Sequence, residues 1–336
     1  MPTLRIGLIY DRFGDAEKPA GAPPDWDVEY EPEETIVALE DALRTLGHEP
    51  VRIGNVQALL AQLCRQPGEA PLAIDAAVNI AESYGSRNRE AHAPVLLELA
   101  GIPCIGSDAL ALSVSLDKAW TKDLVRTVDV ATPEYRVFRS ADEVLDADLP
   151  QLPLMVKPRY EGTAKGIAPS SRCESAGAVR QEVARQAALY GQDILVERFI
   201  SGGEFTVALV GNDPPRALPV LQRATERHSG IGLHALERYE RPEAPFEYEL
   251  LGSIDPILEI RLKDLAHRAY QKLDVKDFAR VDFRVDANNK PWFIEINPLP
   301  TFAPDGTFAI IAELAGRSYP EFLAEVLAEG LARVMG

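Results

Sequence analysis

The sequence predicts an α/β protein that contains an N-terminal parallel sheet. Over the first hundred residues, short apolar runs alternate with amphipathic helical segments, which is typical of consecutive βαβ units. Further along, strands and helices are mixed, and a long hairpin is expected at residues 279–297. Because the chain has 336 residues, it can form two or three domains.

The N-terminal elements follow from the spacing of apolar residues. Leu4–Tyr10 is a short apolar strand, and Glu33–Leu46 is a helix with one apolar face that ends at Gly47. No G-x-G-x-x-G motif follows the first strand, so the fingerprint of a dinucleotide site is missing. The other elements expected in this part are strand 51–53, helix 56–64, strand 73–80, helix 89–100 and strand 102–105.

The next part of the chain contains a loop suited to phosphates. Strand Leu154–Pro158 leads into Arg159–Gly166, in which small residues are flanked by cations. Such a loop can wrap phosphates with its backbone N–H groups, although glycine-rich surface loops are common. The stretch 226–243 has no clear periodicity and is expected to be a mobile loop and a candidate lid. The remaining expected elements are a helix carrying Asp117 and Lys118, helix 176–190, strands 193–199 and 204–210, helix 257–273, and one or two helices over 313–335.

Composition narrows the classes of function. The net charge of −17 argues against nucleic acid and anionic membranes as partners, since both require a basic surface. The three cysteines have no metal-like spacing, and so sparse a count suits a reducing compartment. The N-terminus has no signal-type apolar run, and no stretch is long enough to cross a bilayer. We therefore expect a cytoplasmic protein.

The hairpin places two acids face to face. Both arms alternate with period two, and Asn288-Asn289 fits a two-residue turn because asparagine tolerates positive φ. Two opposed carboxylates repel each other, and a hard cation such as Mg²⁺, which prefers oxygen ligands, removes the conflict. The expected pairs are Val285 with Trp292, Phe283 with Ile294 and Val281 with Ile296 on an apolar face, and Asp282 with Glu295 and Arg280 with Asn297 on a polar face.

Taken in order, these motifs resemble the ATP-grasp superfamily and, within it, the D-alanine–D-alanine ligase family. The resemblance covers nearly the whole chain and is specific only as a set. It rests on residues 99–103, 115–118, 156–166, 196–207, 279–283 and 293–297. It implies a three-domain ATP-grasp fold, with an N-terminal α/β domain at 1–117, a central domain at 118–203 and a C-terminal domain at 204–336. It also implies the reaction, in which ATP phosphorylates a carboxylate and an amine attacks the acyl phosphate.

The resemblance also assigns roles within the ATP site. Lys118 and Lys157 would contact ATP phosphates, with Thr163 in the loop above them. Glu197 would bind the adenine amino group, Phe199 and Ile200 would flank the base, and Glu204 would hold the ribose. Asp282, Glu295 and Asn297 would ligate Mg²⁺, or Mn²⁺ in its place, and Arg280 would stabilise the transition state. Without the family pattern, the lysines and glutamates would be interpreted as solvated surface residues and Arg280 as a surface ion-pair partner.

The substrate regions depart from the family pattern. The family's histidine segment is replaced by residues 79–90, where Glu82, Arg87 and Arg89 stand, and the two arginines are candidates for gripping a substrate carboxylate. Glu29, Glu31, Glu33 or Glu34 could replace the family's substrate-binding glutamate. Past Asn297, the family glycine that assists the oxyanion falls at Leu299 or Thr301. Asp305 would disfavour an acceptor carboxylate and favour a cationic or hydroxylated group, and Tyr239 is a candidate for covering the site.

We therefore expect an ADP-forming carboxylate–amine ligase, with small-molecule substrates, whose substrates are not two D-alanines. Three alternatives stay open at this point. They are a genuine D-alanine–D-alanine ligase with a divergent N-terminal domain, an intramolecular ligase that closes a ring, and a non-catalytic nucleotide-binding regulator. The family also suggests a homodimer.

Overall fold

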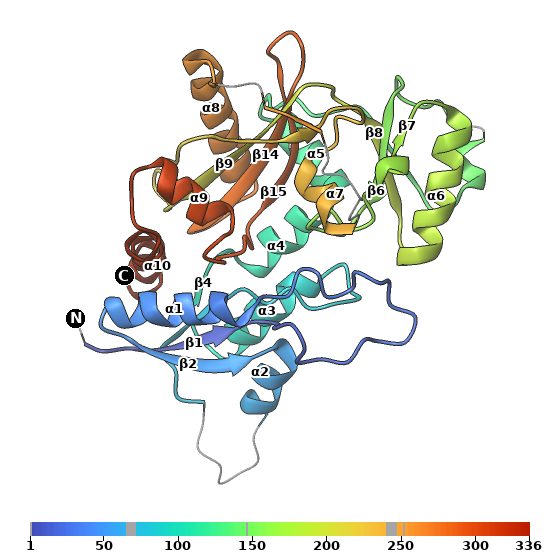
Figure 1. Cartoon of the computed structure of the whole chain (residues 1–336). Coiled ribbons are helices and arrows are strands. Elements are labelled where there is room, and N and C mark those ends of the chain that lie inside the picture. Colours follow the sequence, from blue (N-terminus) through green and yellow to red (C-terminus); the bar gives the residue numbers. More distant parts are fainter. Residues whose placement is uncertain (1, 65–71, 146, 240–246, 251–252) are drawn as a thin grey trace.

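The structure is a computed structural model that describes residues 2–64, 72–145, 147–239, 247–250 and 253–336. Three main sheets follow one another along the chain, with helices packed on them (Figure 1). This arrangement confirms the predicted α/β class. Short 3-10 turns occur at Arg89–Ala91, Asp142–Val144 and Pro169–Ser171.

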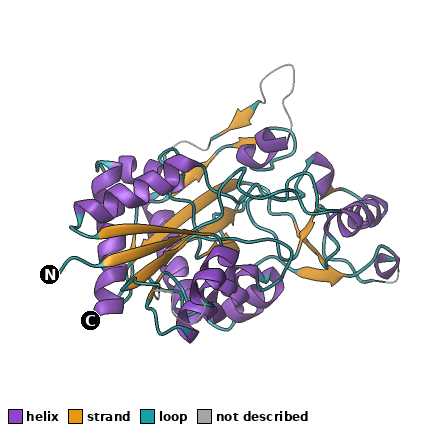
Figure 2. Ribbon diagram, turned by 90° about the horizontal axis from the view of Figure 1, so that it is seen from below, coloured by secondary structure: helices purple, strands orange, loops and turns teal. Residues whose placement is uncertain are grey.

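The N-terminal sheet is parallel, as predicted. Its strands are β1 (Arg5–Ile9), β2 (Glu49–Gly54), β3 (Ala76–Asn79) and β4 (Cys104–Ile105), in the order β2-β1-β3-β4. Ile6 and Leu8 pack against α1 (Glu33–Thr45) and α10 (Tyr319–Met335), whereas Ile9 packs against α2 (Val56–Leu63) and α3 (His92–Leu99). The sheet is therefore covered on both faces, as parallel sheets are, and Figure 2 shows helices on both sides of it.

The central sheet is antiparallel. Helix α6 (Ala176–Tyr190) covers one of its faces and leaves the other open. The apolar residues Leu154, Val156 and Val196 pack with this helix. Between them Lys157 and Glu197 point to the opposite face, where they line a cavity. The strands are β5 (Tyr135–Phe138), β6 (Leu154–Pro158), β7 (Arg172–Cys173) and β8 (Ile194–Arg198), in the order β5-β8-β6-β7.

The C-terminal sheet has the same one-sided character. Phe205, Val281 and Phe283 pack with α8 (Pro256–Lys272) and with Val125 of α5 (Lys118–Arg126). The alternate residues Glu204, Arg280 and Asp282 face the cavity. The strands are β9 (Gly203–Val210), β10 (Arg216–Ala217), β11 (Leu221–Arg223), β14 (Phe278–Val285) and β15 (Pro291–Asn297), in the order β10-β9-β14-β15 with β11 also paired to β9.

The predicted hairpin register is correct at the end that contains Asp282 and Glu295 and wrong near the turn. Arg280 pairs with Asn297, Val281 with Ile296 and Asp282 with Glu295, as predicted. Beyond Asp282 a bulge shifts the pairing, so Phe283 lies opposite Phe293 and Val285 opposite Pro291. The cause is a longer loop, in which the N–H of Asn289 donates to the carbonyl of Asp286 and only Asn289 of the asparagine pair has positive φ. The bulge at Ile294 compensates for the extra loop residue.

Three helices, α5, α9 (Thr307–Leu314) and α10, pack against a sheet other than the one nearest to them in the sequence. Helix α5 precedes the central sheet but belongs to the core of the C-terminal sheet. Phe308 of α9 and Phe322 of α10 join the core of the N-terminal sheet. The chain therefore returns to its beginning, and the two termini lie near each other (Figures 1 and 2). Helix α4 (Ala109–Leu116) connects the N-terminal sheet to α5.

The expected loop at 226–243 contains regular structure instead. Helix α7 (Leu233–Tyr239) occupies its middle, and β12 (Thr225–Glu226) pairs with β13 (Tyr248–Glu249). The helix is too short to be stable by itself. The packing of its buried residues Ala235 and Leu236 beside Phe199 stabilises it. Residues 240–243 lie outside the described part of the chain.

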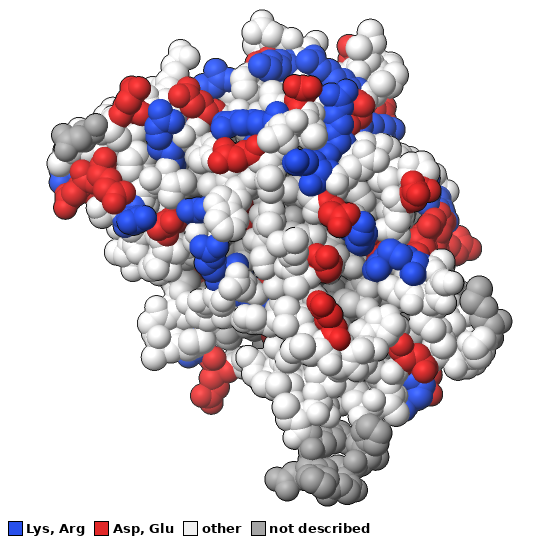
Figure 3. Space-filling model, turned by 180° about the vertical axis from the view of Figure 1, so that it is seen from behind, with Lys and Arg blue, Asp and Glu red and all other residues white. Residues whose placement is uncertain are grey.

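No helix in the described ranges is long and apolar enough to span a lipid bilayer. On the rear face, acidic and basic side chains are interspersed (Figure 3), so the negative net charge is not gathered into one acidic surface there.

Candidate active site

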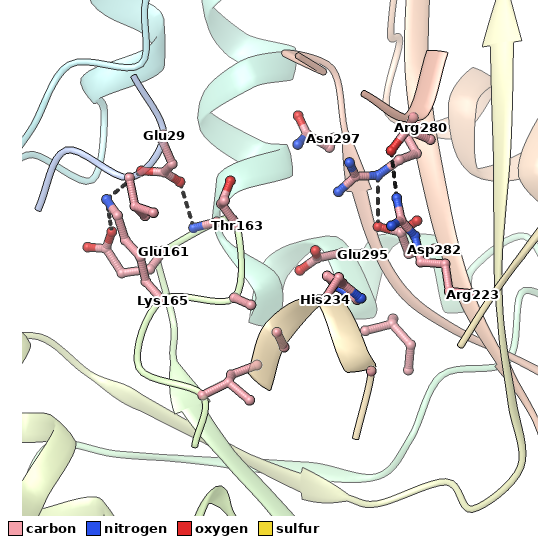
Figure 4. Close-up of a pocket in the computed structure, with 18 of the residues that line it drawn as sticks. Glu29, Glu161, Thr163, Lys165, Arg223, His234, Arg280, Asp282, Glu295 and Asn297 are labelled. Atoms are coloured by element: carbon pink, nitrogen blue, oxygen red, sulfur yellow. Dashed lines mark hydrogen bonds and ion pairs between the residues drawn. The ribbon is translucent and has the colours of Figure 1, made fainter. Parts of the chain in front are cut away.

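A cavity of about 650 Å³ lies where the open faces of the central and C-terminal sheets meet residues from the N-terminal part of the chain. Its wall includes every residue predicted for the ATP and metal sites. Those residues are Lys118, Lys157, Thr163, Glu197, Phe199, Ile200, Glu204, Arg280, Asp282, Glu295 and Asn297. Figure 4 shows Arg280, Asp282 and Glu295 on the right and Thr163 and Lys165 of the glycine-rich loop on the left.

At one end of the cavity, Glu197 is held between two buried lysines. Its carboxylate oxygens lie 2.8 Å from Nζ of Lys122 and 2.7 Å from Nζ of Lys157. Burial opposes ionisation of this acid, but the two ammonium groups outweigh it and lower the pKa of Glu197 to about 2. Glu197 therefore stays ionised, fixed and able to accept a hydrogen bond from a ligand.

Beside Glu197, the wall combines an aromatic ring with an ion pair. The ring of Phe199 is contacted by the guanidinium groups of Arg172 and Arg284, at 4.9 and 4.8 Å from its centroid. Arg284 also lies 3.3 Å from the carboxylate of Glu204. An apolar surface next to an oriented carboxylate suits a base and a hydroxylated sugar.

The glycine-rich loop curls over the cavity. Thr163 and Ala164 both have positive φ, at 50° and 58°, which is a strained conformation for non-glycine residues. Glu29, which precedes α1, accepts the N–H of Gly162 at 2.9 Å, and a Cβ atom at Gly162 would clash with that carboxylate. Lys118 donates to the carbonyl of Glu161 and lies 3.6 Å from Glu295. The loop is therefore fastened by a residue from the N-terminal part of the chain.

The opposite end of the cavity holds the facing acids. Nε of Arg280 donates to Oδ2 of Asp282 at 3.0 Å, and the hydroxyl of Thr206 donates to Oδ1 at 2.7 Å. Burial raises the pKa of Asp282, but the charges of Arg280 and Arg223 and the hydrogen bond from Thr206 together outweigh burial, so the pKa is lowered. Oδ1 of Asn297 accepts the N–H of Leu299 at 2.9 Å, which orients this side chain.

This donor set fits a hard cation. Two carboxylates and an amide oxygen converge on one side of the hairpin, and each oxygen keeps a free lone pair beside its present partner. The described residues contain no cluster of three or more His, Cys, Asp or Glu side chains suited to a metal. The site would therefore need ligand oxygens from elsewhere, such as phosphates, to complete the coordination of Mg²⁺.

The predicted substrate residues divide into two groups. Arg87 does not line the cavity, because its guanidinium packs on the rings of Trp120 and Tyr160, at 5.1 and 5.5 Å. Arg89 does not line it either; it is 2% exposed and donates to both oxygens of Glu29 at 2.8 Å. The expectation that these arginines grip a substrate carboxylate therefore has no support from the geometry. By contrast Glu82, Thr301 and Asp305 line the cavity.

Of the four candidate glutamates, two reach the cavity. Glu29 and Glu31 line it, whereas Glu33 forms ion pairs with Arg12 and Arg52, and Glu34 is exposed. Glu31 accepts hydrogen bonds from Thr35 and Thr301 at 2.8 and 2.9 Å. Its pKa is raised by burial, and the charge of Asp305 adds to the effect. The side chain of Tyr239 lies outside the described residues.

Sequence reasoning missed several cavity residues. Arg223 of β11 donates to the hydroxyls of Thr206 and Thr307, at 3.0 and 2.6 Å, and no carboxylate pairs with it among the described residues. His234 of α7 lies 3.7 Å from Glu204. Lys165 lies 2.5 Å from Glu29 and 3.0 Å from Glu161. Only Lys165 had a signal, since it belongs to the glycine-rich loop; β11 is too short to reveal a period.

Comparison with known proteins decides the family. The family model described as D-ala D-ala ligase C-terminus matches residues 124–328, more than half of the chain. The chain is 30% identical over 331 residues to the uncharacterized protein y4sG of Sinorhizobium fredii, covering 95% of this chain and 92% of that protein. The chain belongs to the D-alanine–D-alanine ligase family. Membership confirms the predicted resemblance and makes the chain an ADP-forming carbon–nitrogen ligase of the ATP-grasp type.

Other members of the family give the same result. The D-alanine–D-alanine ligase of Desulforudis audaxviator is 31% identical over 290 residues, covering 85% of this chain and 89% of that enzyme. The structure of the VanG D-Ala:D-Ser ligase from Enterococcus faecalis superimposes with a TM-score of 0.73 at 17% identity, over 98% of this chain and 100% of that one. The D-alanine–D-alanine ligase from Bacillus anthracis complexed with ATP gives a TM-score of 0.67 at 18% identity, over 99% of both chains. These likenesses confirm the ATP-grasp fold.

Proposed function

We propose that the protein uses ATP to join a carboxylate to an amine through an acyl phosphate, and that its substrates are not two D-alanine molecules. The ATP and metal residues of the family are retained in one cavity, which supports the first part. The second part is supported by the side chains that surround the remainder of that cavity, where the substrates would lie.

The observation that carries the altered specificity is the saturation of Glu29. This acid stands in the region from which the family supplies a substrate-binding glutamate. One of its oxygens accepts from Gly162 and Arg89, and the other accepts from Arg89 and Lys165. A carboxylate oxygen has two lone pairs, so Glu29 has none left for a substrate ammonium group. The family's way of binding its first amino acid is therefore closed at this position.

The reaction would proceed with the residues acting as follows. Lys118, Lys157 and the loop N–H groups would position the triphosphate. An oxygen of the substrate carboxylate attacks the γ-phosphorus, the bond to the β–γ bridging oxygen breaks, and ADP leaves. The amine nitrogen then attacks the acyl carbon, loses a proton and displaces phosphate, leaving an amide. Bound Mg²⁺ would neutralise phosphate charge between Asp282, Glu295 and Asn297, with Mn²⁺ as an alternative ion.

Arg280 would act on the transferring group. It is buried beside Asp282, and its pKa is raised because Asp282 and Glu295 outweigh the cost of its burial. It therefore remains a fixed cation at the metal end, aimed at charge that develops on the phosphoryl oxygens and on the tetrahedral intermediate.

The acceptor end has mixed charge. Asp305 and Glu31 favour a cationic or hydroxylated acceptor, as the sequence suggested, whereas Arg223 favours an anionic group nearby. Asp305 is exposed and screened by water, while Arg223 is half-buried. These side chains support an acceptor other than D-alanine without selecting one chemical class.

The test is a product screen. The protein is incubated with ATP, Mg²⁺ and pooled amino acids and amines, ADP release is followed, and products are identified by mass spectrometry. An amide other than D-alanyl-D-alanine is expected. D-Alanyl-D-alanine as the main product would identify a genuine D-alanine–D-alanine ligase, and a product 18 mass units below one substrate would identify ring closure. ATP binding without ADP release under any condition would leave the nucleotide-binding regulator.

A further inference from the structure

We propose that Lys122 is a positioning residue that holds the adenine end and the metal end of the nucleotide site in a fixed relation. It does not line the cavity, and the family resemblance assigns no role to it. The inference rests on the proposed ATP site, because it concerns how two parts of that site are held together.

Lys122 is a fully buried lysine with a complete set of partners. Its side chain is 0% exposed, and the charged end of a lysine is rarely so deeply enclosed without a specific reason. Its Nζ lies 2.8 Å from Glu197 and donates to the hydroxyl of Thr132 and the carbonyl of Ile294, both at 3.0 Å. The contacts to Thr132 and Ile294 are hydrogen bonds and the contact to Glu197 is an ion pair, so the ammonium group has three polar partners.

Two of these contacts reach the two ends of the cavity. Glu197 forms part of the wall that would receive the adenine. Ile294 immediately precedes Glu295 and is the bulged residue of the hairpin. A bulge leaves a carbonyl without its regular strand partner, and Lys122 satisfies this one. The orientation of Glu295 therefore depends on a bulge that Lys122 stabilises, while the same ammonium group orients Glu197.

Helix α5 explains how one residue can do this. Lys118 and Lys122 are four residues apart and so lie on one face of the helix. Lys118 approaches Glu295 at 3.6 Å, and Lys122 holds the residue before it. The helix is itself packed in the core of the C-terminal sheet through Val125. Helix α5 therefore places Lys118 and Lys122 against two adjacent residues of strand β15, Glu295 and Ile294.

A role in packing alone does not account for a lysine here. Burial lowers the pKa of Lys122 to about 8, since the charge of Glu197 offsets only part of the desolvation cost. An apolar side chain would fill the same space next to Phe293 without that cost. The ammonium group is retained at a cost to stability, as is common for groups that position an active site.

The experiment compares Lys122→Met with Thr121→Val. Methionine keeps the length of the side chain and removes the charge. Thr121 is the buried neighbour on α5, whose hydroxyl donates to Val114 at 2.6 Å, so its loss perturbs the same helix without touching Glu197 or Ile294. Calorimetry gives the Kd of Mg²⁺–ATP and of Mg²⁺–inosine triphosphate, which lacks the adenine amino group, and the Mg²⁺ concentration needed for half-maximal ATP binding.

For Lys122→Met, we expect the Kd of Mg²⁺–ATP to rise by about tenfold or more. Loss of one hydrogen bond to a charged group has an effect of this size. The preference for ATP over inosine triphosphate should fall and the Mg²⁺ requirement should rise, whereas Thr121→Val should leave all three quantities within about twofold. If Lys122→Met does not fold, Thr132→Val, which removes one acceptor of the ammonium group, should shift the same quantities in the same direction by a smaller factor.

Two results would overturn the inference. One is an unchanged nucleotide preference and Mg²⁺ requirement in both Lys122→Met and Thr132→Val. The other is a loss of nucleotide preference with an unchanged Mg²⁺ requirement, which would show that the two ends are not coupled. Failure of the unaltered protein to bind Mg²⁺–ATP would instead refute the proposed ATP site, so the two failures are distinguishable.

Discussion

Asp282 on β14 lies directly opposite Glu295 on β15, and the bulge that follows Asp282 leaves this pairing intact. Asp282 forms hydrogen bonds with Arg280 and Thr206, whereas Glu295 has Lys118, at 3.6 Å, as its one ion-pair partner among the described residues. The two acids are thus held together by cations and donors on their outer sides. Both acids line the cavity, where a metal ion would be held between them in the proposed site.

Replacing Asp282 by Asn should weaken metal binding while keeping the hydrogen bond from Thr206. Removing one charged ligand should raise the Mg²⁺ concentration for half-maximal ATP binding by roughly 10- to 100-fold. Calorimetry at varied Mg²⁺ measures this quantity. Asp274→Asn, at an exposed position near the same strand, is the control. An unchanged Mg²⁺ requirement in Asp282→Asn would place the metal elsewhere.

Replacing Arg280 by Ala should reduce turnover much more than ATP binding. Its guanidinium would act on charge that appears only during reaction, so kcat for ADP release should fall by about 10³-fold or more, while the Kd for ATP changes by less than about tenfold. Arg216→Ala removes an exposed arginine of the same sheet and should change neither value. An equal loss of binding and turnover would assign Arg280 a structural role.

Replacing Glu29 by Gln should destabilise the whole protein. Arg89 and Lys165 are both buried and both depend on this carboxylate. Leaving two buried cations without their common partner should cost roughly 3 kcal/mol or more. Thermal unfolding measures the effect, with Glu34→Gln at an exposed position of the first turn of α1 as the control. A melting temperature equal to that of the control would contradict the proposed saturation of Glu29.

Glu90 should make stability depend on pH. Burial raises its pKa to about 7 from an ordinary value of 4.5; Arg89 opposes the shift and Glu29 adds to it. A folded pKa above the unfolded one gives stability that is complete below pH 4.5 and is lost as pH rises through about 7.

Glu90→Gln removes this loss, so its melting temperature relative to the unaltered protein should be higher at pH 8.5 than at pH 5.5, by at least about 2 °C. Thermal scans at both values measure the difference. Glu98→Gln, on α3 and without a partner role at the site, should show no such change. A difference that does not depend on pH would mean that Glu90 is ionised throughout.

The sequence predicted the fold well wherever local pattern and tertiary environment agree. The alternation of β1 to β4 with helices gave the parallel sheet, and period two gave both arms of the hairpin. It failed at the turn, because a three-residue loop and a compensating bulge produce the same pairing of Asp282 with Glu295 as a two-residue turn. It also missed α7, which is too short to show a period and is held by its contacts around Phe199.

The candidate site was predictable where residues occur in compact motifs. The residues expected for ATP and metal all reach one cavity, although their individual roles remain proposals. The structure does not place Arg87 or Arg89 in the cavity wall, and the sequence does not reveal that Glu29, 60 positions away, would neutralise Arg89 in the interior. Arg223 and Lys122 were missed for the same reason: their importance lies in partners such as Thr307 and Ile294 that only the fold brings near.

The central claim is an ATP-dependent ligase with altered substrate pockets, and ADP release with D-alanine as the only organic substrate tests it most directly. The assay is run with Mg²⁺–ATP, with D-alanine alone and then with the pooled acids and amines, and with Arg280→Ala as the inactive control. We predict release near the control level with D-alanine alone and release well above it with a component of the pool. Rapid turnover with D-alanine alone, with D-alanyl-D-alanine as product, would contradict the account.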